Sequence, residues 1–179
     1  MDTIIISGFY GIGKSECARA NPGCIDLEAK SYAWKTNESG KFEKDAAGQN
    51  IRNPDFPNNY MRDINEQIGK VPIICVSTRI EVRDALVRSG MPFTLVYPER
   101  GLRADYIRRC EKRGSPREFV NFLETRWDEL LADLEAQPGC DKIVLAQGQF
   151  LGDVISHIKP GHPADDSAIA VQARGLQAA

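Results

Sequence analysis

Residues 3–15 read TIIISGFYGIGKS. The first five, rich in β-branched side chains, predict a buried strand, and residues 8–15 satisfy the pattern G-x-x-x-x-G-K-[ST]. Glycines in such a turn let backbone N–H groups close around a phosphate chain, and the helix that begins near Lys14 points its positive end at the same anion. The stretch therefore predicts a strand, a phosphate-binding loop (P-loop) and a helix.

Seven residues in and directly after this loop are expected to hold a nucleoside triphosphate. Lys14 is expected to reach the β- and γ-phosphates, and Ser15 to ligate Mg²⁺. The full set expected to bind ATP comprises Gly8, Gly11, Ile12, Gly13, Lys14, Ser15 and Glu16. A glycine-rich turn that matches the pattern by coincidence is the alternative, but the apolar run before it and the helical pattern after it supply the required context.

Composition predicts one globular domain in the cytoplasm, as a monomer or a homodimer. The chain has 179 residues and a formal net charge of -2, so nothing global favours a nucleic-acid or membrane partner. Its five cysteines show no C-x-x-C spacing, which argues against zinc and favours a reducing compartment. No apolar run approaches the roughly 18 residues of a membrane span.

Strand-like and helical patterns alternate along the chain. The apolar runs lie at residues 3–7, 24–27, 71–77, 92–97 and 142–146. The alternation predicts an α/β fold, a three-layer P-loop sandwich with a five-stranded parallel sheet and helices on both faces. The predicted domain spans residues 1–158, with a polar insertion at 33–54 that fits a hairpin, and residues 159–179 form a loosely ordered tail. No internal repeat is evident.

Other P-loop classes lack their companion motifs in this sequence. A GTPase should show D-x-x-G after a strand and N-K-x-D, and neither occurs. The third strand ends in Ser77 where a motor ATPase would have aspartate. The second strand instead ends in Asp26 and Glu28, which face the same way because residues two apart in a strand share a face.

These two carboxylates suit phosphoryl transfer. Asp26 is expected to hold water on Mg²⁺, with Ser15 as the other metal ligand, or to accept the proton of an attacking hydroxyl. Glu28 is expected to share that task or to bind the acceptor. A solvated acidic strand end is the alternative.

A cationic segment between the fourth strand and the last long helix predicts a lid. From Arg79 to Arg117 the chain carries ten Lys or Arg and five Asp or Glu, a charge of +5 against -7 for the remainder. Arginines at about residues 99–117 are expected to close over the transferred phosphoryl group. Arg109 and Arg113, close to a hinge at Gly114, are the catalytic candidates, and Arg103 lies farther out on the acceptor side. A solvated helix face is the alternative.

Taken in order, these segments resemble the nucleoside and nucleotide kinase branch of the P-loop fold. More narrowly, RNPDFPNNY at residues 52–60, LVYP at 95–98 and RGSP at 113–116 look like the small kinases of bacteriophages. The likeness covers about residues 3–155, and Ala29 and Lys30 depart from it because the group has a second small hydroxyl residue there. It implies a Mg²⁺- and ATP-dependent phosphotransferase, located in the host cytoplasm if a phage encodes it.

The resemblance leaves the acceptor open. The phage group includes thymidylate-kinase-like enzymes that phosphorylate 5-hydroxymethyluridine in DNA, which is the preferred reading. A kinase of free nucleoside monophosphates and a non-catalytic ATP-binding regulatory module are the alternatives. Four residues lie where an acceptor base could stack or be hydrogen-bonded, although the aromatic ones equally suit packing: Trp34, Arg52, Asn53 and Phe56.

Overall fold

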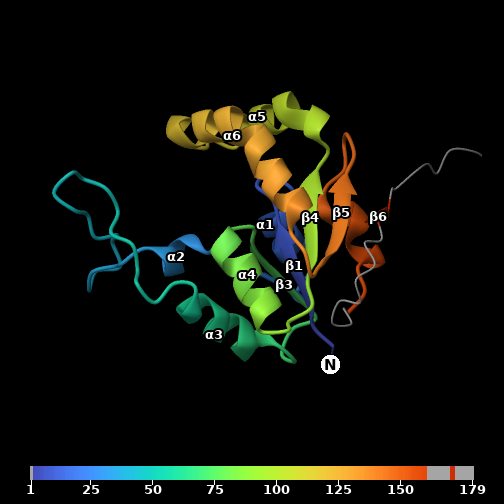
Figure 1. The fold of residues 1–179 in the computed structure, drawn as a ribbon, viewed down its shortest axis with the longest axis horizontal. Helices are drawn as coiled ribbons and strands as arrows, with labels where there is room; N and C mark the ends of the chain where they lie inside the picture. Colours follow the sequence, from blue (N-terminus) through green and yellow to red (C-terminus); the bar gives the residue numbers. More distant parts are fainter. Residues whose placement is uncertain (1, 161–169, 172–179) are drawn as a thin grey trace, which may run out of the picture.

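The computed structural model describes residues 2–160, 170 and 171. Its centre is a parallel sheet with the strand order β2-β3-β1-β4-β5-β6 (Figure 1). The first five strands are β1 (Ile4–Gly8), β2 (Cys24–Asp26), β3 (Ile73–Ser77), β4 (Thr94–Pro98) and β5 (Asp141–Leu145). Each begins or ends within two residues of its predicted position, so the predicted α/β class and parallel sheet are confirmed.

A short strand adds to the predicted five. β6 (Ala170–Val171) pairs in parallel with β5 through Lys142 and Ile143, so the described sheet has six strands. The prediction of a loosely ordered tail did not foresee this pairing, because two residues carry no readable period. The rest of the predicted tail beyond residue 160 lies outside the described residues.

Helices connect the strands and pack in pairs. They are α1 (Lys14–Ala20), α2 (Lys30–Ala33), α3 (Asn58–Gln67), α4 (Ile80–Arg88), α5 (Arg103–Lys112), α6 (Arg117–Ala136) and α7 (Leu151–Val154), with short 3₁₀ turns η1 (Arg100–Leu102) and η2 (Ile155–His157). α1 packs on α7, α3 on α4, and α5 on α6. This arrangement is compatible with the predicted three-layer sandwich.

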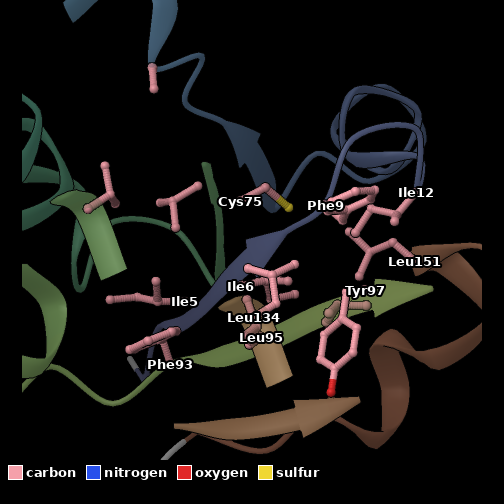
Figure 2. Packing of buried hydrophobic residues seen from close by; sticks show 14 of the residues in the cluster. Ile5, Ile6, Phe9, Ile12, Cys75, Phe93, Leu95, Tyr97, Leu134 and Leu151 are labelled. Carbon is pink, nitrogen blue, oxygen red and sulfur yellow. The ribbon is translucent and has the colours of Figure 1, made fainter. Parts of the chain in front are cut away.

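The hydrophobic core includes residues of the turn between β1 and α1. The central strands are buried almost throughout, as expected for a parallel sheet covered on both faces. Figure 2 shows Phe9 and Ile12, which belong to that turn, beside Leu151 in the core. The backbone N–H of Leu151 also donates to the Ile12 carbonyl at 2.8 Å. The core therefore anchors the turn from below.

The predicted lid segment rests on α6. Tyr106 and Cys110, on the apolar face of α5, are fully buried. The indole N–H of Trp127, from α6, donates to the Arg100 carbonyl at 2.8 Å. Ion pairs add to this contact, since Arg100 approaches Glu135 to 2.6 Å. In this structure α5 and η1 are docked on α6.

The polar insertion forms an arm that extends from the body between α2 and α3 (Figure 1). Three main-chain hydrogen bonds of 2.9 Å close a ring at its centre: Lys35 N–H to Ile51 O, Ile51 N–H to Glu43 O, and Glu43 N–H to Lys35 O. Lys35, Glu43 and Ile51 follow one another at intervals of eight residues along the chain. The predicted single hairpin is therefore replaced by two successive turns that meet in one junction.

The turns of this arm repeat the same local geometry. The side-chain oxygens of Asn37, Asp45 and Asn53 each accept the N–H two residues ahead. The carbonyl of each also accepts the N–H three residues ahead, at 2.9 to 3.2 Å. The arm, residues 33–53, thus holds an eight-residue repeat, and we call it the octad arm. No repeat was predicted, because the units share little sequence beyond the Asn or Asp that makes each turn.

Candidate active site

Backbone geometry explains the glycines of the turn between β1 and α1. Gly11 and Gly13 have φ angles of 73° and 97°, a region that favours glycine. A Cβ on Gly8 would lie 2.7 Å from the Ile12 Cδ1 and 2.8 Å from the Lys14 Cδ. The turn therefore folds closely around the Lys14 side chain, and a methyl group at residue 8 would displace it.

The Lys14 ammonium is held by the turn itself. Its Nζ donates to the Gly8 carbonyl at 2.7 Å and to the Phe9 carbonyl at 2.9 Å. Burial lowers the pKa of Lys14, the negative charge of Asp26 opposes that shift, and the positive charge of Arg113 adds to it.

Two oxygen-bearing side chains meet at the mouth of the turn. The Ser15 hydroxyl, in the first turn of α1, donates to the Asp26 Oδ2 at 2.7 Å, from the end of β2. Mg²⁺ prefers oxygen ligands and is held by one or two carboxylates together with waters and substrate phosphates, so this pair fits it. Glu28 lies two residues beyond Asp26 and is exposed, whereas the Glu16 carboxylate is paired with Arg19 at 2.7 Å.

A cavity of about 180 Å³ adjoins the turn. Its lining includes Tyr10 from the turn, Thr78 and Arg79 after β3, and Leu130 and Asp133 from α6. Burial raises the pKa of Tyr10, and the positive charge of Arg79 opposes that shift, so the guanidinium and the phenol are close. The cavity thus combines an arginine, a phenol, a carboxylate that pairs with Arg83, and apolar walls.

Sequence reasoning missed this cavity. The available signal was position: Thr78 and Arg79 directly follow β3, and the carboxyl ends of parallel strands meet at one edge of the sheet. Tyr10 stands at a variable position of the loop pattern, which carries no signal of its own.

Arg109 is brought to the turn by aromatic stacking. Its guanidinium lies 4.5 Å from the centre of the Tyr106 ring and 4.1 Å from that of Phe150, and it pairs with Asp105 at 2.8 Å. A Cβ on Gly11 would lie 3.4 Å from the Tyr106 ring, and a Cβ on Gly13 would lie 3.6 Å from the Phe150 ring. The stack therefore flanks the turn on two sides. Phe150 was not predicted.

Arg113 and Arg103, the other two arginines predicted for the lid, contact different partners. Arg113 donates from Nε to the Ser115 hydroxyl at 2.9 Å, and its charge acts on Lys14. Arg103 instead approaches Asp128 of α6 to 3.6 Å. The structure brings Arg109 to the turn, places the exposed Arg113 6.0 Å from the Phe119 ring of α6, and directs Arg103 toward Asp128 of the same helix.

The four predicted acceptor residues gather at the base of the octad arm. The Arg52 guanidinium lies 5.5 Å from the Trp34 ring and 4.6 Å from the Phe56 ring, and it pairs with Glu81 of α4 at 2.5 Å. Asn53 donates its N–H to the Ala33 carbonyl at 3.0 Å. These contacts fix the arm to the body, whereas the cavity beside the turn is lined by other residues.

Comparison with protein-family models gives no match, and comparison with curated proteins gives none either. In residues 2–160, 170 and 171, no helix is both long and apolar enough to cross a bilayer. The same residues contain no group of three or more His, Cys, Asp or Glu side chains arranged to hold a metal ion. A metal at Ser15 and Asp26 would therefore need further ligands from a bound nucleotide and water.

Proposed function

We propose that this protein is a Mg²⁺- and ATP-dependent phosphotransferase of the P-loop nucleoside and nucleotide kinase type. One observation carries the proposal: Lys14, Ser15 and Asp26 converge at the mouth of a glycine turn, and a cavity with an arginine adjoins that same turn. A donor site beside a recess for a second molecule is what transfer between two substrates requires.

Each residue has a part in the proposed transfer. Lys14 and the loop amides neutralise the β- and γ-phosphates, and Arg109 and Arg113 add positive charge from α5 and its end. The Asp26 carboxylate accepts the proton of the acceptor hydroxyl as its oxygen bonds to the γ-phosphorus. The bond from that phosphorus to the ADP oxygen breaks, and ADP leaves with the electron pair. If Asp26 instead holds Mg²⁺ or its water together with Ser15, the metal would supply further charge neutralisation.

The acceptor that we propose is 5-hydroxymethyluridine within DNA. The support is the resemblance to phage kinases, together with cationic side chains on the lid: Arg108 is 73% and Arg103 50% exposed, as phosphate contacts along a strand would require. A free nucleoside monophosphate would need contacts within the cavity alone.

One transfer assay tests the proposal. The protein is incubated with Mg²⁺ and ATP labelled on the γ-phosphate, together with thymidine, thymidine monophosphate or an oligonucleotide that contains 5-hydroxymethyluracil. We expect label in the oligonucleotide. Label in thymidine monophosphate alone would assign a free-nucleotide kinase. ATP binding without transfer to any acceptor would leave a regulatory module and reject the proposed enzyme.

A further inference from the structure

The hydrogen-bond ladder between β2 and β3 is interrupted at its carboxyl end. The two strands pair in parallel up to Asp26 opposite Cys75, and the Leu27 N–H continues the ladder to the Cys75 carbonyl at 2.9 Å. In a parallel ladder the next bond would run from the Ser77 N–H to the Leu27 carbonyl. Here the Ser77 N–H donates to the Tyr60 hydroxyl at 3.3 Å, and that hydroxyl donates to the Leu27 carbonyl at 2.5 Å.

A side chain from α3 has thus entered the sheet. Tyr60 is fully buried, and its ring lies 4.9 Å from that of Tyr32 and 6.1 Å from that of Phe56. Burial raises the pKa of Tyr60, so its hydroxyl keeps its proton and remains a donor to Leu27. The hydroxyl leaves neither ladder group unsatisfied, but it puts one oxygen atom between two strands that would otherwise bond directly.

The interruption falls between the two halves of the candidate active site. Asp26 lies just before it, still paired with Cys75, and beyond it lie Glu28 on one side and, on the other, Thr78 and Arg79, which line the cavity. Direct pairing of Ser77 with Leu27 would draw these two strand ends together. The inserted oxygen therefore sets the width of the edge at which donor and acceptor would meet.

We propose that Tyr60 is a positioning residue that holds the carboxyl ends of β2 and β3 apart at Leu27 and Ser77, and so sets the distance between the end of β2, directly after Asp26, and the acceptor cavity. This inference rests on the proposed function. Tyr60 touches neither substrate, and its effect passes through the Leu27 carbonyl and the Ser77 amide. A misplacement of about 1 Å between reacting groups can lower a rate by about 10².

The test is Tyr60→Phe, compared with Tyr32→Phe. The control removes a neighbouring tyrosine hydroxyl, whose hydrogen bond goes to Asp63 of α3 and not to a strand. Measurements are the transfer rate at saturating ATP to the hydroxymethyluracil oligonucleotide and to thymidine monophosphate, ATP affinity, thermal midpoint, and the Ser77 amide resonance. We expect Tyr60→Phe to lower kcat/KM for the acceptor by about 10 to 10² with ATP affinity unchanged. The Ser77 amide should shift, and Tyr32→Phe should leave the acceptor parameters at the parent level.

Each other outcome overturns the inference. Parent-like acceptor kinetics in Tyr60→Phe would show that the inserted hydroxyl does not position the site. An equal loss of ATP affinity and acceptor turnover, or an unfolded variant, would assign Tyr60 to the fold alone. A parent protein that transfers label to no acceptor would reject the proposed function, and the inference with it, whereas an active parent with an unaffected variant rejects the inference only.

Discussion

At the scale of single residues, Lys14 has no substitute within the turn that holds it. Lys14→Ala should lower transfer by ~10²–10³, the range for losing one preorganised charge stabiliser. The thermal midpoint should also fall, since Lys14 holds the carbonyls of two buried residues, Gly8 and Phe9, so transfer is measured well below the midpoint of the variant. Steady-state kinetics on the purified variant check this, with Lys70→Ala, an exposed lysine, as the control. Unchanged turnover would remove the turn from the mechanism.

Asp26 and Glu28 allow a matched comparison. Asp26→Asn keeps the shape and an acceptor for the Ser15 hydroxyl but removes the charge and the base, so transfer should fall by at least ~10² while ATP still binds. Glu28→Gln, at an exposed position two residues on, should have a much smaller effect. Transfer rates and ATP affinities of both variants distinguish the roles. Equal losses of binding and turnover in Asp26→Asn would mean that this residue serves only the metal or the fold.

At the scale of elements, the arginines of the α5 segment are expected to have two different roles, binding DNA phosphates or supporting transfer. If DNA is the acceptor, Arg103→Ala should reduce the slope of log affinity against log salt by about 0.9 for duplex or about 0.7 for a single strand. Arg109→Ala should instead lower turnover, because its guanidinium lies against the Tyr106 and Phe150 rings that flank the glycine turn. DNA affinity at several salt concentrations checks the first variant, and the steady-state transfer rate at saturating ATP checks the second. No DNA binding by the parent at low salt would contradict the DNA substrate and favour a free nucleotide.

Elements defined by local sequence were predictable, and those defined by distant contacts were not. The strand, glycine turn and helix at residues 3–15 follow from an apolar run and a spaced pattern, so β1 and α1 lie where expected. The cavity needs α6 to approach Tyr10, and the β2–β3 interruption needs Tyr60 to arrive from α3. Neither contact can be predicted from a period in the sequence, because each depends on how the helices pack on the sheet.

At the scale of the whole molecule, buried thiols and phenols make the fold sensitive to alkali. Burial raises the pKa of Cys17 and of Cys140 to about 11, from 9.0. Burial likewise raises the pKa of Tyr32 and of Tyr106 to about 12, from 10.0. Because the folded state holds these protons more tightly than the unfolded chain, their contribution to stability is complete below about pH 9 and is lost between about pH 9 and 12.

The urea midpoint should therefore fall steadily as pH rises from about 9 to 11. Cys140→Ala should weaken that dependence because it removes one of the shifted groups. Urea titrations at four pH values on parent and variant provide the check. A midpoint that stays level across this range would show that these groups ionise in the folded state as easily as in the unfolded chain.

The octad arm determines where this protein can tolerate insertions and deletions in the course of evolution. The chain leaves the body at Ala33 and returns at Asn53, whose N–H meets the Ala33 carbonyl at 3.0 Å. The excursion is thus a closed detour, and the entropic cost of closing such a loop grows by only about 0.6 kcal/mol for each doubling of its length. Length changes in multiples of eight keep the spacing on which the main-chain ring of the arm depends, so we expect them to leave the flanking β2 and α3 where they are. Heritable length variation should accumulate in this segment, while the sheet that carries the glycine turn keeps its dimensions.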